Sequence, residues 1–257
     1  FNRNKVLELG GEEYKEMAEG DGHLKTGSVR RLIVGEPIGV FYGYRFDGIF
    51  QNEEECKQQT SSASPIGVGL RRYKDLNGDG KVDAANDREI LGDANPKFFG
   101  GLTNTFAYKG FELNVFLQYS YGNKILNYNA MELENPTGGQ NAYADMVNRW
   151  TPENPSNIYP KATTNRALLV SDRFIEDGSY LKLKTLSLSY SFPKINLKHI
   201  QGLRLYVTGQ NLLTWTKYRG YDPEVSYRGA STLEAGEDFG GYPQSRTFMF
   251  GIKLDIK

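Results

Sequence analysis

The stretch Tyr180–Phe192 alternates between two kinds of side chain, and this alternation constrains the fold more than any other feature of the sequence. Neighbouring side chains of a β-strand point to opposite faces. One face is therefore expected to run from cations through leucines to aromatic rings, and it comprises Tyr180, Lys182, Lys184, Leu186, Leu188, Tyr190 and Phe192. The opposite face ends in hydroxyl-bearing residues. This pattern is typical of a transmembrane β-barrel strand, and it also fits a strand of a soluble β-sandwich.

Composition favours strands and turns and points away from nucleic acid. The chain has 257 residues with 31 Lys+Arg against 31 Asp+Glu, so it lacks the basic excess of a nucleic-acid-binding protein. Its 17 Tyr, 14 Phe and 29 Gly suit strands and turns. The sequence contains no run of about 18 apolar residues, so no membrane-spanning helix is predicted. A barrel strand needs only about 9–11 residues, so this does not exclude a barrel. The chain opens on FNRNKVLEL, a strand candidate, so we expect a C-terminal piece of a longer protein.

The connections between predicted strands alternate between short and long. The further predicted strands are 98–107, 111–121, 203–215 and 246–256. The connection 108–110 is short and 193–202 is moderate, whereas 122–178 and 216–244 are long. A membrane barrel has short turns on one side and long loops on the other, while a sandwich has no reason for this asymmetry.

The predicted fold class is therefore all-β: antiparallel up-and-down strands that form the C-terminal section of a large transmembrane β-barrel. The whole chain, 1–257, is assigned to this barrel segment. The regions 11–97, 122–178 and 216–244 are predicted to be extracellular loops, and the rest of 98–257 is predicted to form barrel hairpins. A strip of about six strands is too narrow to close a wide barrel by itself.

Several segments together resemble the C-terminal portion of SusC/RagA-like TonB-dependent outer-membrane receptors. They are GEPIGVFYGYRFDGIFQ (35–51), YKDLNGDGKVDAANDREILGDANPKFFGGLTNTFAYKGFELNVFLQ (73–118), RWTPENP (149–155), DGSYLKLKTLSLSYSFP (177–193) and VTGQNLLTWTKYRGYDPE (207–224). The final MFGIKLDI, with Gly251, Leu254 and Ile256, is similar to the signal by which outer-membrane barrels are inserted. Such signals usually end on an aromatic residue, whereas this chain ends on Ile256-Lys257.

The resemblance implies a 22-stranded barrel in the bacterial outer membrane, in contact with its lipid and filled by a plug domain that is absent from this chain. It implies import of oligosaccharides or peptides with a SusD-like surface lipoprotein, driven by TonB through regions upstream. The alternative is a soluble extracellular β-sandwich that binds carbohydrate and calcium. These two hypotheses differ in whether Leu186, Leu188, Phe248, Phe250 and Ile252 meet a second sheet about 10 Å away.

Catalysis is not expected. His23 and His199 are the two histidines, and neither lies near a nucleophile motif. The long loops carry aromatic residues that could stack on sugar rings or could pack the loops together. These are Tyr143, Trp150, Tyr159, Trp215, Tyr218, Tyr221 and Tyr227. Gly209-Gln210-Asn211 is interpreted as structural, with the glycine allowing a close backbone approach.

A calcium site is predicted at Asp75–Asp87, DLNGDGKVDAAND. The oxygen ligands of an EF-hand-type loop fall at positions 1, 3, 5, 7, 9 and 12, with glycine at 6. Asp75, Asn77, Asp79, the Lys81 carbonyl and Asp83 fill the first five of these, with Gly80 at the turn. Position 12 is Asn86, so the site closes either through Asn86 or, as we favour, through Asp87. The Lys81 side chain is expected to point away. The alternative is a surface turn without metal.

Overall fold

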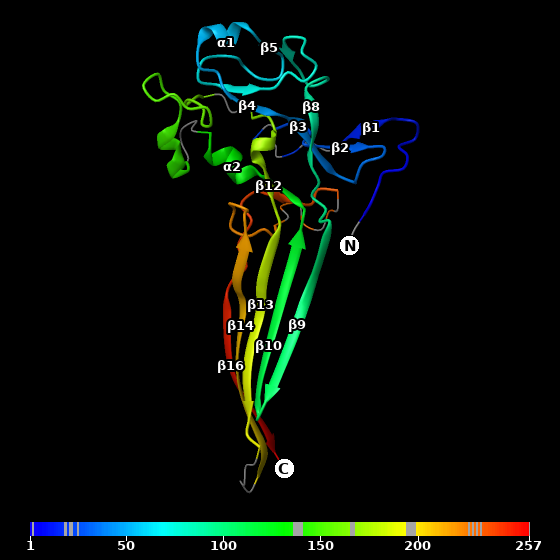
Figure 1. Cartoon of the computed structure of the whole chain (residues 1–257), viewed down its shortest axis with the longest axis vertical. Coiled ribbons are helices and arrows are strands. Elements are labelled where there is room, and N and C mark those ends of the chain that lie inside the picture. Colours follow the sequence, from blue (N-terminus) through cyan, green and yellow to red (C-terminus); the bar gives the residue numbers. More distant parts are fainter. Residues whose placement is uncertain are drawn as a thin grey trace.

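The chain forms a long antiparallel sheet with a folded cap at one end (Figure 1). The computed structural model describes residues 1, 3–17, 20, 23–24, 26–135, 141–164, 168–193, 199–225, 227, 229, 231 and 233–256. The cap consists of the described residues of 1–97, 122–179 and 217–246, and the sheet contains the rest. No helix in the described part of the chain is long and apolar enough to cross a membrane.

The sheet has five strands in the order β16-β14-β13-β10-β9. They are β9 (Phe98–Tyr108), β10 (Phe111–Tyr121), β13 (Tyr180–Ser191), β14 (Ile200–Thr216) and β16 (Thr247–Ile256). All neighbours are antiparallel. Lys109 and Gly110 join β9 to β10 with φ of 45° and 87°, and two positive φ values are what a two-residue hairpin turn requires. All five predicted strands from residue 98 onward are thus confirmed to within a few residues.

The predicted strand at 1–9 is wrong for the described residues of that stretch. In the described part of this stretch, Val6 bonds to the turn at residues 35–36, and no ladder with another strand forms. The Val6 amide donates to the Glu36 carbonyl and the Gly35 amide donates to the Val6 carbonyl, both at 2.9 Å. The strip of about six strands is therefore a sheet of five.

One face of the sheet is apolar and the other is polar. Residues directly opposite each other on paired strands share a face. The pairs Leu113–Leu188, Leu188–Val207 and Val207–Phe250 therefore form a continuous apolar row across four strands. The pairs Asn114–Ser187 and Ser187–Thr208 form the polar counterpart.

A β-bulge at Lys184 corrects the predicted faces of the upper half of β13. Thr185 pairs with Phe116, and Leu183 pairs with the next residue, Leu117, so Lys184 is one extra residue. An extra residue shifts every side chain beyond it to the opposite face. Leu181 and Leu183 therefore join the apolar face. The prediction that Tyr180 and Lys182 share the face of Leu186 and Leu188 is wrong, because both lie with the polar residues.

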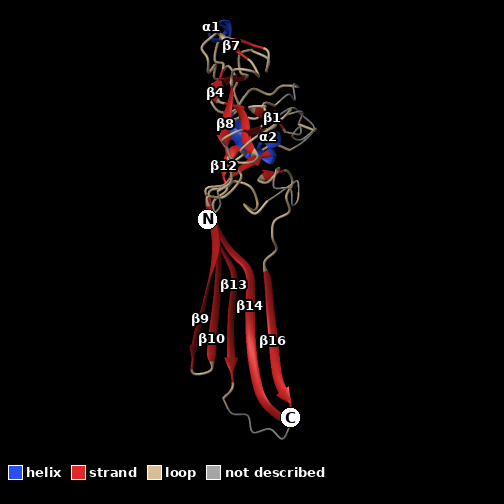
Figure 2. Ribbon diagram, turned by 90° about the vertical axis from the view of Figure 1, so that its right-hand side faces the viewer, coloured by secondary structure: helices blue, strands red, loops and turns tan. Residues whose placement is uncertain are grey.

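The apolar face is open. Phe248, Phe250 and Ile252 are exposed, Phe250 by 81%, and Leu188 is exposed as well, while Leu186 is half-buried. Within the described residues no second sheet packs against this face, and the strands of the sheet contact one another (Figure 2). This arrangement contradicts the β-sandwich hypothesis, which requires a second layer about 10 Å away.

The three regions predicted as extracellular loops are folded together in the cap, and they are not open loops. The cap strands are β1 (Tyr14–Glu16), β2 (Arg30–Ile33), β3 (Val40–Tyr44), β4 (Phe46–Ile49), β5 (Thr60–Ser61), β6 (Arg71–Tyr73), β7 (Lys81–Val82), β8 (Arg88–Gly92), β11 (Lys124–Asn127), β12 (Ile175–Asp177) and β15 (Glu237–Asp238). The helices are α1 (Glu53–Lys57) and α2 (Tyr128–Leu133), with 3-10 turns at Ala144–Asn148 and Asp172–Phe174. The β11–β15 and β5–β7 pairs are parallel.

The cap has its own hydrophobic core, which all three regions share. Phe41 comes from the first region, Leu126, Met131 and Phe174 come from the second, and Phe239 of the third packs against them. At about 25 cal/mol per Å² of apolar surface removed from water, each buried large side chain contributes about 1.5–3 kcal/mol to stability. The regions therefore stabilise each other rather than folding one by one.

Gly251 on β16 provides space for the Tyr206 ring of β14. The two residues are directly paired, and a Cβ added at Gly251 would overlap the Tyr206 ring. A tyrosine lying across a strand glycine covers its bare backbone, which helps to fix the register.

Replacing Gly251 with valine should lower the free energy of unfolding by about 1–3 kcal/mol, the typical cost of overpacking. The additional change Tyr206→Ala should recover part of this loss, because it removes the ring that valine meets. Urea unfolding of the receptor in detergent measures both variants. Equal stability of Gly251→Val and wild type would contradict the assigned contact.

Candidate functional site

A cluster of charged side chains binds the cap to the polar face of the sheet. Lys182 is only 1% exposed, and its Nζ lies 2.5 Å from Asp222 Oδ1 and 2.6 Å from Glu224 Oε2. Lys184 Nζ, at the bulge, lies 2.8 Å from the same Glu224 oxygen. The bulge thus brings two lysines of one strand beneath one acidic segment of the cap.

Glu224 accepts hydrogen bonds from four side chains. Besides the two lysines, the Tyr180 hydroxyl donates at 3.0 Å and the Gln118 amide at 2.9 Å. Burial of Glu224 by itself raises the pKa of its carboxyl, but the bonds from Lys182 and Lys184 outweigh burial and lower that pKa to about 2. The carboxylate therefore stays ionised at any physiological pH and holds the segment around it against β10 and β13.

A polar cavity of about 330 Å³ lies beside this cluster. Lys182 and Asp222 form one side, and Tyr221, Gln244 and Arg246 are among the other lining residues. Its walls come from the polar ends of β13 and β14 and from the cap. A concave site with several convergent polar groups can hold a polar ligand.

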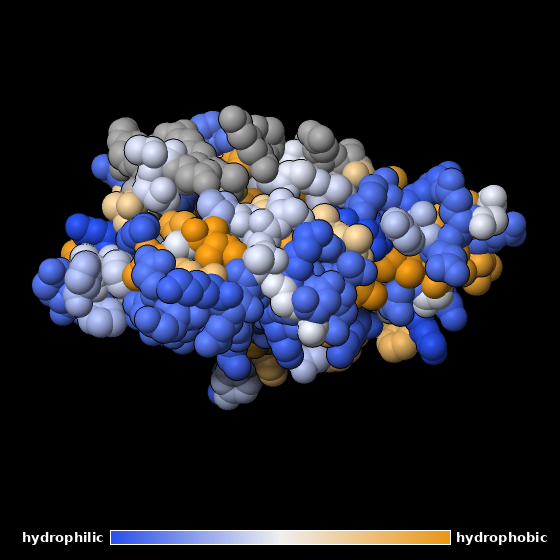
Figure 3. Space-filling view, turned by 90° about the horizontal axis from the view of Figure 1, so that it is seen from above, coloured by the Kyte–Doolittle hydropathy of each residue, from blue (hydrophilic) through white to orange (hydrophobic). Residues whose placement is uncertain are grey.

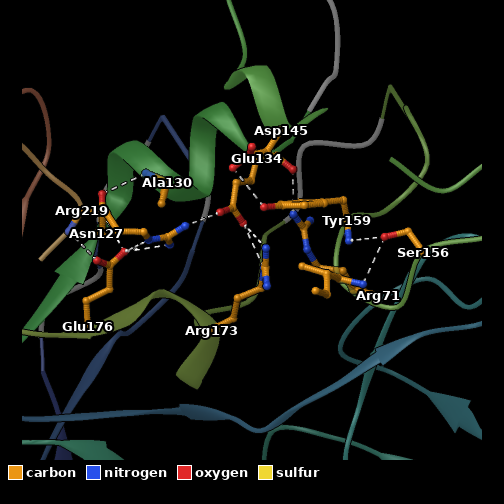
Figure 4. Close-up of polar contacts among 11 residues, drawn as sticks. Arg71, Asn127, Ala130, Glu134, Asp145, Ser156, Tyr159, Arg173, Glu176 and Arg219 are labelled. Atoms are coloured by element: carbon orange, nitrogen blue, oxygen red, sulfur yellow. Dashed lines mark hydrogen bonds and ion pairs between the residues drawn. The ribbon is translucent and has the colours of Figure 1, made fainter. Parts of the chain in front are cut away.

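A second charged cluster joins separate regions inside the cap (Figure 4). Glu134, which caps the C-terminus of α2, is 1% exposed. Its Oε2 accepts from Arg173 Nη2 at 2.6 Å and its Oε1 from Arg219 Nη1 at 2.9 Å. Arg219 also bonds Glu176 Oε1 at 3.0 Å. Burial lowers the pKa of Arg219, but the bonds to Glu176 and Glu134 outweigh burial and raise it.

A buried ion pair joins β2 to β15. Arg30 Nε lies 2.9 Å from Glu237 Oε1, with both side chains 2% exposed. The same guanidinium donates to the carbonyls of Gly39 and Ala235 and lies over the Phe41 ring at 4.1 Å. Removing one member of a buried pair typically costs about 3–5 kcal/mol, because the other charge is left unpaired.

Most of the aromatic residues considered as sugar-stacking candidates pack the cap instead. Trp150 Nε1 donates to Gln51 Oε1 at 3.0 Å, the Tyr159 hydroxyl donates to Asp145 at 3.3 Å, and Tyr143 packs against the core. The Tyr218 hydroxyl donates to Asp238, and Tyr227 lies edge-on to Phe239. Trp215 is exposed on the apolar face, whereas Tyr221 is exposed beside the polar cavity. Tyr221 is therefore the candidate placed for ligand contact.

Gly209 and Asn211 have structural roles, but the close approach at Gly209 comes from a side chain and not from the predicted backbone. A Cβ at Gly209 would lie 2.8 Å from the Leu212 side chain. Asn211 has a φ of 52°, a backbone conformation that asparagine tolerates better than most residues. Its side-chain amide donates a hydrogen bond to the Ser245 carbonyl of the cap at 3.1 Å.

The Asp75–Asp87 loop is closed by Asp87, and Asn86 is exposed. The Asp87 side chain is fully buried and accepts from the Leu76 and Asp83 amides, both at 2.7 Å. Asp75 accepts from the Gly78 and Gly80 amides, and Asp79 accepts from the Lys81 amide. The expectation that Lys81 points away is wrong, because its Nζ lies 3.2 Å from Asp83 Oδ2.

The loop offers oxygen donors without forming a ready metal cage. Each carboxylate has about four lone-pair sites, so the two hydrogen bonds that Asp75 and Asp79 each accept leave room for a cation. The amides of Thr60 and Ser62 bond the carbonyls of Gly80 and Val82, so the Lys81 carbonyl between them faces away from β5. No group of three or more His, Cys, Asp or Glu side chains among the described residues is arranged as a metal site.

The sequence is similar to much longer receptors. It is 38% identical over 259 residues to TonB-dependent receptor P3 of Formosa agariphila, covering 98% of this chain and 26% of the relative. TonB-dependent receptor P26 of the same organism is 34% identical over 260 residues, with 98% and 26% covered. TonB-dependent receptor SusC of Bacteroides thetaiotaomicron is 26% identical over 268 residues, with 100% and 24% covered. The chain thus spans about a quarter of the length of these relatives. No family model matches it.

The fold is similar to part of a solved transporter. The RagAB peptide transporter matches with a TM-score of 0.74 at 24% identity, covering 99% of this chain and 26% of that one. The open-open state of the RagAB peptide importer matches with a TM-score of 0.72 at 22% identity, with 97% and 25% covered. At these identities the likeness concerns the fold. The chain resembles, along nearly its whole length, the C-terminal part of a SusC/RagA-like TonB-dependent outer-membrane receptor.

The hydrogen bonds that attach Glu224 to the sheet should weaken only in acid, as the Glu224 carboxylate becomes protonated. Its folded pKa of about 2 lies below its ordinary value of 4.5, so its stabilising contribution is complete above pH 4.5 and is lost as the pH falls toward 2. Hydrogen exchange of residues 221–225, corrected for the intrinsic rate, should stay slow at pH 5 and rise below it. The double variant Lys182→Met, Lys184→Met should exchange fast at pH 7 already. Equal protection in this variant and in wild type at pH 7 would contradict the role of Lys182 and Lys184 in holding Glu224 against the sheet.

Proposed function

We propose that this sheet is part of the wall of a 22-stranded transmembrane β-barrel in the bacterial outer membrane, within a receptor for TonB-dependent import. The observation that carries the proposal is the open apolar face of an otherwise hydrogen-bonded sheet, opposite a face of polar side chains. Phe250 and Ile252 on one face and Arg204, Glu112 and Ser189 on the other suit lipid and a water-filled interior, respectively.

In this proposal the cap faces the extracellular side and the turn at 108–110 faces the periplasm. The connection 193–202 is assigned to the same side, although its residues 194–198 lie outside the described part of the chain. The three long regions lie together at one end of the sheet, and the hairpin turn and the C-terminus lie at the other end (Figure 1). Outer-membrane barrels carry their long loops outside and their short turns inside.

The imported substrate is proposed to be an oligosaccharide or a peptide, delivered by a SusD-like surface lipoprotein that closes on the cap. Similarity to SusC and to the RagAB transporter supports this, together with the polar cavity beside Tyr221. Coupling to TonB is proposed to run through other parts of the receptor. Catalysis has no place in this proposal, since the relatives are receptors and transporters.

The cap surface is the proposed contact for the lipoprotein. Viewed from above, apolar side chains interrupt a mainly polar surface (Figure 3). Val147 and Ile158 are 75% and 51% exposed on the cap. Both side chains would lose contact with water in an interface with the lipoprotein, which would favour binding.

Changing Val147 and Ile158 together to serine should reduce co-purification of the lipoprotein with the receptor, because the contact loses apolar area. Insertion into the outer membrane should be unchanged. The matched control is Tyr108→Ser, an exposed apolar residue at the opposite end of the sheet, which should leave co-purification intact. A loss with Tyr108→Ser and none with the cap variant would reverse the proposed orientation.

We also propose that the Asp75–Asp87 loop binds calcium. The ligands would be the side chains of Asp75, Asn77, Asp79 and Asp83 and the Lys81 carbonyl, with Asp87 closing the loop. The observation in favour is the burial of Asp87, which draws both ends of the loop around the other carboxylates. A cation would neutralise their mutual repulsion, and its role would be structural.

Calorimetry of the purified receptor should show calcium binding with a dissociation constant between about 10⁻⁷ and 10⁻³ M, the range of such loops. Asp79→Ala should weaken binding at least tenfold, because it removes a charged ligand. The control Glu89→Ala, in the adjoining β8, should leave binding unchanged. Absence of heat at millimolar calcium, with wild type and Asp79→Ala equally stable, would exclude the site.

A further inference from the structure

Arg71 is a buried cation without a carboxylate of its own. Its side chain is 9% exposed, and Nη2 donates to the Glu134 backbone carbonyl at 3.1 Å. Its Nε makes no hydrogen bond, and the guanidinium lies 5.7 Å from the centre of the Phe174 ring. No described carboxylate forms an ion pair with Arg71. An unpaired buried charge is costly, so this donor calls for a partner.

The carboxylates near Arg71 are already committed. Glu134 binds Arg173 through one oxygen and Arg219 through the other, and Glu176 binds Arg219 and the Asn127 amide. The cluster of Arg71, Arg173, Arg219, Glu134 and Glu176 therefore carries one positive charge in excess. Burial lowers the pKa of Arg71, and the Arg173 charge acts in the same direction, whereas Tyr73 and Glu134 oppose them.

A small cavity lies beside the free donor. It measures about 40 Å³, and Arg71, Ser64, Tyr73 and Asn135 are among its lining residues, together with Pro65 and Pro160. Asn135 is 4% exposed, and its Oδ1 is also without a hydrogen-bond partner. Two unsatisfied polar side chains, one from β6 and one from just beyond α2, thus line the same partly open cavity.

We propose that this cavity binds a small inorganic anion, of the size and charge of chloride. The Arg71 Nε–H is the primary donor, and the hydroxyls of Ser64 and Tyr73 are within the same lining. A half-turn of the Asn135 amide turns Nδ2 to the anion in place of Oδ1, and it breaks no hydrogen bond of that side chain within the described residues. The anion cancels the excess charge and gives both orphaned groups a partner.

The charge of the cluster selects the class of ligand. The cavity has room for a monatomic anion beside Arg71. A neutral water would satisfy Arg71 Nε and Asn135 Oδ1 but would leave the charge uncompensated. The anion would tie the segment 64–73 to Asn135, Pro160, Thr163 and Leu168, which belong to another of the three regions that make up the cap.

Crystals of the full receptor grown with sodium bromide in place of chloride test this directly. The expected result is an anomalous bromide peak within hydrogen-bonding distance of Arg71 Nε. The peak should vanish in Arg71→Met and should persist in the matched control Arg72→Met, whose side chain pairs with Asp47 and Glu55 instead. An ordered water or empty density at this position in bromide-grown wild-type crystals would overturn the proposal.

A measurement in solution remains informative if Arg71→Met does not fold. Hydrogen exchange of residues 70–73 in the wild-type receptor should slow at least threefold when gluconate, too large for the cavity, is replaced by chloride at constant ionic strength. Exchange of residues 30–33 of β2, away from the cavity, serves as the control. Equal exchange of residues 70–73 in the two salts would overturn the proposal, whatever the import activity of the receptor.

Discussion

The alternation of side chains along β13 is the constraint on which the rest of the structure depends. A strand with one apolar and one polar face keeps that division only while the alternation is unbroken. The extra residue at Lys184 breaks it once and moves Lys182 to the polar face, under the cap. In the proposed barrel a lysine on the lipid side near the interface would cost at most about 1 kcal/mol, so the bulge removes a small penalty. It also supplies the cation that Asp222 and Glu224 require, and thereby couples the sheet to the cap.

In the cap, three long segments of the chain fold together into one unit. Its contacts are long in sequence: Arg30 pairs with Glu237, Arg219 pairs with Glu134, and the Tyr44 amide bonds the Val170 carbonyl at 2.9 Å. Because these partners are between 85 and 207 residues apart, their contacts hold the three regions of the cap to one another.

The sequence predicts the sheet well and the cap poorly, for a physical reason. Strands 111–121 and 180–192 have a period-two pattern that depends only on neighbours in sequence, and their predicted bounds agree with β10 and β13. The bulge at Lys184 was not predictable from the sequence. Leu181 and Leu183 alternate regularly with Lys182 and Lys184, so the pattern does not show that the two faces of the strand exchange at Lys184. Glu134, Arg71 and Glu224 were missed because their roles depend on distant partners. Two lysines within a strand, together with the acidic pair in YDPE, were the available signal for the Lys182 cluster. In the Asp75–Asp87 loop, spacing placed Asn86 at the closing position, whereas the buried side chain of Asp87 bonds both ends of the loop, and the Lys81 side chain turns to Asp83 against expectation.

Single cysteines placed one at a time from Leu181 to Tyr190, in the receptor reconstituted in lipid, test the central claim most directly. Each is labelled with a fluorophore and exposed to a quencher confined to lipid tails and to one confined to water. The account predicts lipid quenching at 181, 183, 186, 188 and 190 and aqueous quenching at 185, 187 and 189, with the period-two pattern out of step by one residue at 184. An unbroken alternation through 184, or equal quenching of both sets by the aqueous reagent, would contradict it.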